Sequence, residues 1–330
     1  MREFDYRRAP DVPGAVALLD DDPDARYLAG GTNLVDLMKS GVERPARLVD
    51  VRELPLDRIE PAPDGGLRVG ATATNSDLAA HPEVRRHYPM LAQAVLAGAS
   101  GQLRNMATVG GNLLQRTRCA YFTDTTKPCN KREPGTGCPA ITGEHHNHAI
   151  LGASETCVAV HPSDMAVALT ALDAVLHYET ADGQGELPIE QLYLPVADTP
   201  DRETALPVGA LVTGVTLPRV PVAARSRYRK VRERASYAFA IGSVAAALDI
   251  RDGVVHDARL AFGAVASRPW RARAAERALI GAPATAETFA AAAEAELAAA
   301  RPLPHNGYKV TLMRNLTVAV LSELAEEAAR

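Results

Sequence analysis

All four cysteines of this 330-residue chain lie in one short segment. Cys119, Cys129, Cys138 and Cys157 are separated by nine, eight and eighteen residues, and no sustained apolar repeat of a strand or a helix runs between them. A loop of this length without its own secondary structure is uncommon in a compact domain unless it is functional or disordered. The clustering therefore predicts that the loop 113–157 wraps around a single four-cysteine site.

Three kinds of chemistry could explain such a set of cysteines. Disulfides suit small secreted domains, whereas this chain is long enough to bury a core and begins MREFDYRRAP, without an apolar signal region. Structural zinc usually shows paired C-x2-C spacings, which this sequence lacks. A [4Fe-4S] cluster needs one thiolate for each iron and accepts widely spaced cysteines on a folded loop. The cysteines alone favour a cluster and leave zinc or unliganded thiols open as alternatives.

The same loop contains three histidines in the run EHHNH. Imidazole is a common zinc ligand, so His145, His146 and His148 are candidate ligands. A polar run between glycines is more typical of a solvated turn. We therefore interpret the three histidines as solvent-exposed.

Charge and hydropathy exclude several classes of function. The formal net charge is -4, which gives no sign of a surface that binds nucleic acid. No apolar run is long enough to span a membrane, so we expect no transmembrane segment. We find no Ser/His/Asp set or carboxylate pair of the kind that hydrolases use.

The first unit, residues 1–55, is predicted to be a small α/β domain. Asp11 is a candidate N-cap for a helix, and strands are expected at residues 26–29 and 47–51. Two glycines separate the first of these strands from a helix that Gly41 ends. A glycine turn before a helix can bind a phosphate, although it is more often simply a tight turn.

The second unit, residues 56–221, is predicted to repeat this arrangement. We expect two helices between residues 75 and 100, capped first by Asn75 or Ser76, and then a strand that ends at a second Gly-Gly pair, residues 110–111. After the cysteine loop, Ser163 is expected to begin an amphipathic helix that leads into a strand. For Ser163, capping and ligand binding are equally good interpretations.

The third unit, residues 222–330, is predicted to be an antiparallel sheet with three helices packed on one face. Asp252-Gly253 is a strong hairpin signal, and alternating arginines before it indicate a half-exposed strand. Lys230 breaks this alternation, which would let it meet an anionic or electron-rich ligand.

Four stretches in order, AGGTNLVDLMKSG, ATVGGNL, HPSD and KVRERASYAFA, resemble the flavin-binding subunit of molybdenum hydroxylases. The resemblance covers essentially the whole chain. It implies an α+β protein with a two-subdomain FAD-binding fold of the PCMH or vanillyl-alcohol-oxidase type, followed by a C-terminal domain like that of the carbon monoxide dehydrogenase flavoprotein. Two branches of the family carry a four-cysteine insert with a [4Fe-4S] cluster, namely periplasmic-type aldehyde oxidoreductases and 4-hydroxybenzoyl-CoA reductases. The stretches QRTRC and CNKR are closer to the first branch.

The resemblance also implies roles for particular residues. The FAD pyrophosphate would be wrapped by Leu28, Ala29, Gly30, Gly31, Thr32 and Asn33 and by Thr108, Gly110, Gly111 and Asn112. The ribityl-diphosphate region would bond to Ser163 and Asp164, and Lys230 and Tyr237 would lie toward the isoalloxazine ring. The cluster would be held by Cys119, Cys129, Cys138 and Cys157.

The function implied is that of an electron-transfer subunit with FAD and a [4Fe-4S] cluster. Its partners would be a molybdenum-cofactor subunit and a [2Fe-2S] subunit, in a heterotrimer or its dimer, and its acceptor a small molecule or a ferredoxin-like protein. We expect the complex to be cytoplasmic, or periplasmic through a signal on another subunit. The alternatives are the beta subunit of a 4-hydroxybenzoyl-CoA reductase-like enzyme and a zinc-stabilised scaffold without enzyme activity.

Overall fold

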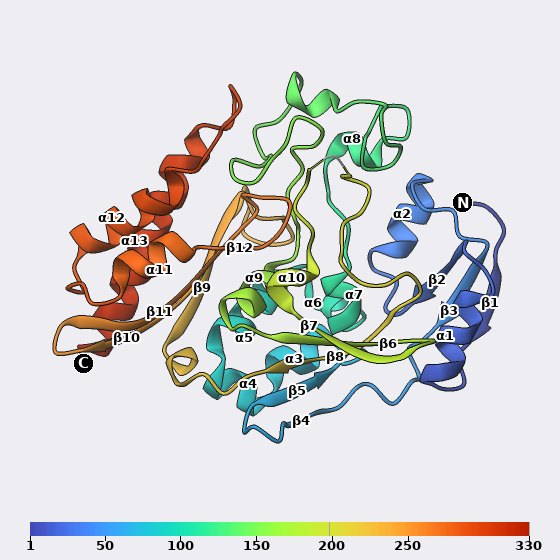
Figure 1. Ribbon diagram of the computed structural model, residues 1–330, viewed down its shortest axis with the longest axis horizontal. Coiled ribbons are helices and arrows are strands. Elements are labelled where there is room, and N and C mark those ends of the chain that lie inside the picture. Colours follow the sequence, from blue (N-terminus) through green and yellow to red (C-terminus); the bar gives the residue numbers. More distant parts are fainter. Residues whose placement is uncertain (198, 330) are drawn as a thin grey trace.

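A computed structural model describes residues 1–197 and 199–329. Three sheets, each with its own helices, lie side by side, and the cysteine loop rises above them (Figure 1). The largest apolar core lies in the middle unit and extends into the C-terminal one, and smaller cores lie in the N-terminal and C-terminal units. The mixed helix and sheet class predicted from the sequence is confirmed.

The N-terminal unit is a parallel three-stranded sheet in the order β1-β3-β2. Its elements are β1 (Asp5–Arg8), α1 (Val12–Asp20), β2 (Ala25–Leu28), α2 (Leu34–Ser40) and β3 (Arg47–Asp50). The Asp11 carboxylate accepts a hydrogen bond from the Gly14 N–H at 2.7 Å, so the predicted N-cap of α1 is confirmed. Gly41, at a φ of 78°, ends α2 as predicted, because a left-handed residue lets the chain leave the helix.

The middle unit is a five-stranded antiparallel sheet in the order β4-β5-β8-β6-β7. Its strands are β4 (Ile59–Pro61), β5 (Leu67–Gly70), β6 (Val175–Thr180), β7 (Gly183–Pro188) and β8 (Leu211–Leu217). The helices of the unit are α3 (Asn75–Ala80), α4 (Pro82–His87), α5 (Pro89–Ala97), α6 (Gly101–Arg104), α7 (Val109–Leu113), α9 (Asp164–Ala171) and α10 (Ile189–Leu192). Strands β5 and β8 pair although 140 residues lie between Gly70 and Leu211. Their pairing encloses the cysteine loop within this unit.

Three predictions for the middle unit are wrong. Residues 75–97 form three short helices and not two, because Pro82 and Pro89 each start a new one. Thr74 caps the first helix, since its hydroxyl accepts from the Asp77 N–H at 3.1 Å. The second Gly-Gly pair lies inside a helix, α7, and not at the end of a strand.

Helix α9 lies at the centre of the molecule. All eight of its residues are buried, so the predicted amphipathic helix is in fact covered on every side. It packs against α5 and against β10 and β11 of the third unit. Ser163 caps it by accepting from the Ala166 N–H at 3.0 Å, and β6 follows it as predicted.

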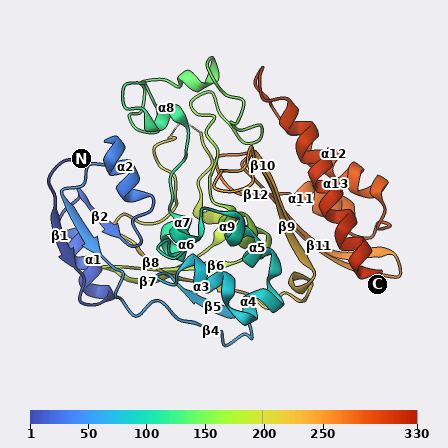
Figure 2. The ribbon, with the colours of Figure 1, turned by 180° about the vertical axis from the view of Figure 1, so that it is seen from behind.

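The C-terminal unit is an antiparallel sheet in the order β12-β11-β10-β9. Its elements are β9 (Ser226–Val231), β10 (Gly242–Arg251), β11 (Val254–Gly263), β12 (Trp270–Arg271), α11 (Arg273–Leu279), α12 (Ala286–Leu297) and α13 (Tyr308–Ala328). Figure 2 shows α13 along the outer face of the sheet, and the hairpin at Asp252-Gly253 is confirmed. The helices cover one face as predicted, and α5 and α9 cover the other.

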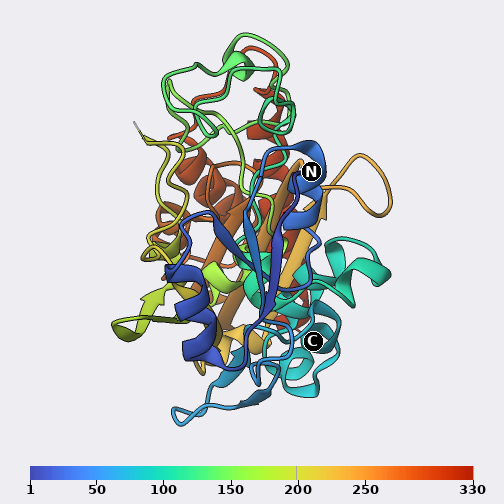
Figure 3. The ribbon, with the colours of Figure 1, turned by 90° about the vertical axis from the view of Figure 1, so that its right-hand side faces the viewer.

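The cysteine loop has only short regular pieces, namely α8 (Ala120–Thr123) and a 3-10 turn (Pro139–Ile141). In Figure 3 it forms the top of the molecule. Its long irregular path agrees with the prediction. None of the helices that the structure describes combines the length and apolar character needed to cross a membrane.

Candidate functional site

A cleft of about 1170 Å³ lies where the three units meet beneath the cysteine loop. Its walls come from α2, from residues 94–107, from α7 and the start of the cysteine loop, from the start of α9, and from residues 230–241. Nine residues predicted to bind FAD line it: Gly30, Gly31, Thr32, Asn33, Gly111, Asn112, Asp164, Lys230 and Tyr237. Side chains more than 200 residues apart in sequence therefore share one cavity of the size that a large cofactor needs.

Five other predicted residues are not among those that line the cleft: Leu28, Ala29, Thr108, Gly110 and Ser163. Thr108 caps α7, because its hydroxyl accepts from the Gly111 N–H at 3.2 Å. Ser163, besides capping α9, donates to the side-chain oxygen of Asn112 at 2.6 Å. These two hydroxyls act on the backbone that shapes the cleft, so their contribution to binding is indirect.

Gly30 brings the two glycine segments together. A Cβ atom at this position would lie 1.8 Å from the backbone oxygen of Met106, far inside van der Waals contact. The missing side chain therefore lets the turn after β2 pack directly on the segment before α7. Gly31 adopts a φ of 71°, a left-handed conformation that glycine accepts without strain.

Asp164 and Lys230 form a buried ion pair at the floor of the cleft. The Lys230 ammonium donates to Asp164 Oδ2 at 2.8 Å and to the Ala97 carbonyl at 3.2 Å, and both side chains are less than a tenth exposed. The Tyr228 hydroxyl donates to the other carboxylate oxygen. Burial, and then the charge of Asp164, raise the pKa of Tyr228 well above its usual value, so this hydroxyl stays protonated. Asp164 is thus already engaged by two donors.

Several buried polar atoms on the cleft wall lack a hydrogen-bond partner among the described residues. They are Asn33 Nδ2, Asn75 Oδ1, Arg118 Nε and His148 Nδ1. Buried polar groups are almost always satisfied, so unpartnered donors and acceptors around one cavity indicate a polar ligand. A dinucleotide such as FAD offers both kinds of partner, and the cleft residues fit it.

Asn75, Arg118 and His148 were not predicted as cleft residues. Asn75 was considered only as a helix cap, and Arg118 and His148 belong to the cysteine loop, which was interpreted as a separate site. A sequence signal existed for Arg118, because it directly precedes Cys119 and follows the second glycine pair by seven residues.

The four cysteines line one small cavity of about 10 Å³. All four are free thiols in the structure. Cys119 also lines the FAD-sized cleft, and is therefore shared by the two cavities. Across residues 1–197 and 199–329, no group of three or more His, Cys, Asp or Glu side chains is arranged to hold a metal ion.

One asparagine ties three arms of the cysteine loop together. Asn130, next to Cys129, accepts from the Gly137 N–H at 2.7 Å and donates to the Thr156 carbonyl at 2.9 Å. Gly137 and Thr156 directly precede Cys138 and Cys157. Hydrogen bonds beside the cysteines thus hold them around the cavity.

Burial raises the pKa of the Cys119 thiol to about 11, and it also raises the pKa values of Cys138 and Cys157. Thiolates bind metals, whereas buried thiols without a cation stay protonated. Metal binding at this cavity would therefore release protons.

The interpretation of the histidines as solvent-exposed is wrong for two of the three. His145 is buried, its ring stacks on His305 with centroids 4.9 Å apart, and its Nδ1 lies 3.1 Å from the Ala140 carbonyl. His148 is partly buried, and its Nε2 lies 3.2 Å from Cys119 Sγ. Only His146 is exposed, because packing of the loop against α13 covers its neighbours.

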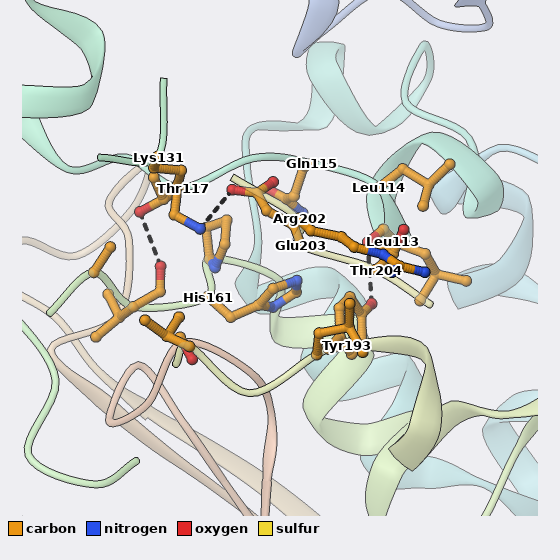
Figure 4. A pocket seen from close by; sticks show the side chains of 16 residues that line it. Leu113, Leu114, Gln115, Thr117, Lys131, His161, Tyr193, Arg202, Glu203 and Thr204 are labelled. Atoms are coloured by element: carbon orange, nitrogen blue, oxygen red, sulfur yellow. Dashed lines mark hydrogen bonds and ion pairs between the residues drawn. The ribbon is translucent and has the colours of Figure 1, made fainter. Parts of the chain in front are cut away.

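A buried ionic cluster joins the cysteine loop to the rest of the molecule, and Figure 4 shows Lys131 pointing toward Glu203 within it. Glu203 Oε1 lies 2.8 Å from the Lys131 ammonium, and Oε2 lies 3.1 Å from Arg116. Burial opposes ionisation of Glu203, yet the two cations together lower its pKa. Arg116 also pairs with Glu43 of the N-terminal unit at 2.7 Å. The cluster anchors the loop without taking part in the cleft.

Residues 232–241, between β9 and β10, form an exposed loop beside the cleft (Figure 3). Tyr237 and Phe239 are about half exposed, and Tyr237 has a φ of 51°. Arg118 lies over the Phe239 ring at 5.0 Å and Arg234 over the Tyr237 ring at 5.5 Å. The aromatic rings on this side fit a flat, apolar part of a ligand.

Two family models together match nearly the whole chain. Residues 2–220 match the FAD binding domain in molybdopterin dehydrogenase, and residues 226–324 match the CO dehydrogenase flavoprotein C-terminal domain. The chain belongs to the FAD-binding subunits of molybdenum hydroxylases. The members of this family are subunits of oxidoreductases, and the resemblance stated from the sequence motifs is confirmed.

One curated relative of this chain is the aldehyde oxidoreductase FAD-binding subunit PaoB of Escherichia coli K12. The two are 48% identical over 330 residues, which cover 99% of this chain and 100% of that protein. The putative xanthine dehydrogenase FAD-binding subunit XdhB of the same organism is 27% identical, over 98% of this chain and 96% of that protein. This chain is therefore of the aldehyde oxidoreductase and xanthine dehydrogenase type.

Two solved structures share the fold of this FAD-binding subunit. A chain of quinoline 2-oxidoreductase from Pseudomonas putida 86 gives a TM-score of 0.77 at 24% identity, covering 100% of this chain and 99% of that one. A chain of carbon monoxide dehydrogenase from Hydrogenophaga pseudoflava gives 0.75 at 25% identity, covering 97% and 96%. The first likeness concerns the fold alone. Together they confirm the predicted FAD-binding fold with a C-terminal antiparallel sheet.

Proposed function

We propose that this chain binds FAD in the large cleft and a [4Fe-4S] cluster in the four-cysteine cavity. On this proposal it is the electron-transfer subunit of a molybdenum-containing aldehyde oxidoreductase-type complex. Its partners are a molybdenum-cofactor subunit and a [2Fe-2S] subunit, and it passes their electrons to an external acceptor. Bound FAD supplies the exchange between one-electron and two-electron transfer, and an iron-sulfur cluster supplies one-electron transfer.

The observation that carries the proposal is that Cys119 lines both cavities. A purely structural metal site has no need to adjoin a cofactor cleft, whereas two redox groups that exchange electrons do. The 48% identity to an aldehyde oxidoreductase FAD-binding subunit over the full chain supports the choice of complex.

The residues of the cleft have separate tasks in FAD binding. The glycine segments around Gly30 and Gly111 bring backbone close to the ligand, and the unpartnered Nδ2 of Asn33 and Oδ1 of Asn75 offer it a donor and an acceptor. Lys230, held by Asp164, keeps a positive charge at the floor of the cleft. Tyr237 and Phe239 line one side of the opening and offer it two aromatic rings.

The cluster is supported by the chemistry of the cavity wall. Four free cysteines are the only candidate metal ligands among the residues that line it, and the nearby Lys131 ammonium favours anionic sulfur by lowering the pKa of Cys157 against the larger effect of burial. Zinc remains the competing occupant. An all-cysteine lining without histidine suits either metal, so metal analysis separates the two.

The test is co-purification of the native complex under anaerobic conditions, followed by reduction with aromatic and aliphatic aldehydes, purines and 4-hydroxybenzoyl-CoA. We expect aldehydes to bleach the flavin absorption of this subunit within the complex. If only a purine or only 4-hydroxybenzoyl-CoA bleaches the flavin absorption, and no aldehyde does, the choice of complex is contradicted. The compartment, cytoplasmic or periplasmic by export with a partner, stays a prediction.

A further inference from the structure

His148 lies between the FAD-sized cleft and the four-cysteine cavity. Its side chain lines the cleft, and its Nε2 atom lies 3.2 Å from the Sγ atom of Cys119, which lines both. The ring is thus in van der Waals contact with the thiol at the one place where the two cavities share a cysteine. None of the four motif stretches includes this histidine.

The tautomer of His148 follows from its two ring nitrogens. Nδ1 is buried and has no partner in the described part of the chain. A metal-bound thiolate carries no proton and can only accept, so the single proton of a neutral imidazole is best placed on Nε2. Nε2–H then donates to Cys119 Sγ, which is a charge-assisted hydrogen bond.

The backbone of His148 is held unusually firmly. Its carbonyl accepts from the Lys309 ammonium at 2.9 Å and from Asn306 Nδ2 at 3.3 Å, and its N–H donates to the His145 carbonyl at 2.9 Å. Lys309 is fully buried and also donates to the Ala264 carbonyl at 2.6 Å, which lies in the segment after β11. The C-terminal unit therefore fixes the position of the ring relative to Cys119.

We infer that His148 is a positioning residue that sets the reduction potential of the cluster by donating a hydrogen bond to the Cys119 thiolate. The inference rests on the cluster proposed above. Hydrogen bonds to cluster sulfurs stabilise the reduced, more negative state and so raise the potential. Backbone groups of Tyr121 and Phe122, in the same turn as Cys119, also hydrogen-bond its sulfur. His148 approaches the sulfur with a side chain that lines the cleft.

The test is a redox titration of the cluster by electron paramagnetic resonance in the complete complex, for the wild type and three variants. His148→Leu removes the donor, and His148→Gln restores an N–H at about the position of Nε2. His146→Leu is the matched control, because His146 also lines the cleft but is exposed and contacts Glu233 rather than a cysteine.

For His148→Leu we expect a lower midpoint potential, by about a tenfold change in the one-electron equilibrium constant, which is about 59 mV. His148→Gln should recover most of this change, and His146→Leu should leave the potential as in the wild type. If the His148→Leu variant loses its iron, the His148→Asn variant takes its place in the titration. The Asn side chain is too short for its amide to reach Cys119 Sγ, so this variant should show the same lower potential.

Two negative results of this experiment lead to different conclusions. A wild-type protein without iron would overturn the cluster and this inference together. If the wild-type protein contains iron, and the midpoint potential of the cluster is the same in the His148→Leu or His148→Asn variant, only the role of His148 is overturned.

Discussion

The side-chain oxygen of Asn33 accepts a hydrogen bond from the backbone N–H of Arg116 at 3.0 Å. Asn33 belongs to the first glycine turn, and Arg116 to the start of the cysteine loop, 83 residues later. The wall of the cleft and the start of the loop are therefore tied at a shared edge. Substitutions that separate the two proposed cofactor sites must lie away from this junction.

Cys138 lines the four-cysteine cavity and not the cleft, whereas Asp164 lines the cleft and not the four-cysteine cavity, so the two residues provide a double test of the two sites. We expect Cys138→Ser to reduce iron to below about one atom per chain, because a cluster needs one thiolate for each iron, while FAD stays bound. Asp164→Asn should weaken FAD binding by about tenfold, or about 1.4 kcal/mol, since Lys230 loses its partner charge, while iron stays. Chemical analysis of iron, sulfide and flavin in each purified variant measures the content of both cofactors. Equal loss of both cofactors in each variant would contradict the existence of two sites.

Gly30→Ala should disrupt the cleft, because the added Cβ would meet the Met106 carbonyl at 1.8 Å and push the two glycine segments apart. We expect FAD affinity to fall by at least about tenfold, the equivalent of about 1.4 kcal/mol, in a fluorescence titration of the deflavinated protein. Gly101→Ala is the matched control, because no heavy atom lies within 4 Å of the place that its added methyl carbon would occupy. Unchanged affinity in Gly30→Ala would show that the backbone contact does not shape the site.

Lys230→Met should destabilise the fold by about 3 kcal/mol, because it leaves the Asp164 carboxylate buried beside a single neutral donor, the Tyr228 hydroxyl. Urea unfolding of the FAD-free protein measures this cost. Lys39→Met is the control, since Lys39 also lines the cleft but is exposed. A cost below about 1 kcal/mol, the size expected for a surface pair, would mean that the ion pair is solvated in solution.

His161 should make the fold less stable in acid. Burial lowers its pKa to about 4 from an ordinary value of 6.5, and its Nε2 has no partner among the described residues. Between these two values the unfolded chain takes up a proton and the folded chain does not, so stability falls as the pH drops from 6.5 toward 4. The loss from this group is on the order of 3 kcal/mol at pH 4.

His161→Asn removes the titration but keeps an acceptor for the Ser163 N–H, which donates to His161 Nδ1 at 3.3 Å. We expect the melting temperature of the variant to fall less than that of the wild type between pH 6.5 and 4. Parallel curves for the two proteins would contradict a neutral, buried His161.

Local signals predicted local structure well. Asp11, Gly41, Ser163 and the Asp252-Gly253 turn all act as their residue types suggest, because caps and tight turns depend on a few neighbouring residues. The second glycine segment was assigned to a strand because its apolar residues resemble one. The structure makes it the helix α7, which Thr108 caps and which packs on Ala71.

The cleft could be predicted only in part, because it is formed by packing between units. The glycine turns, Asp164 and Lys230 were found through motifs. Asn75 and His148 reach the cleft through contacts with segments far away in sequence, such as the Asn75 N–H with the Ala107 carbonyl at 2.8 Å. The burial of His145 depends likewise on His305, in the segment before α13, which a run of polar letters does not reveal.

Cofactor analysis of the anaerobically purified protein tests the central claim most directly. The proposal predicts one FAD per chain together with about four iron atoms and about four sulfides, and a brown-yellow protein with flavin bands above a broad iron-sulfur absorption. Zinc in place of iron and sulfide would contradict the cluster, and a preparation that stays without flavin after incubation with FAD would contradict the assignment of the cleft.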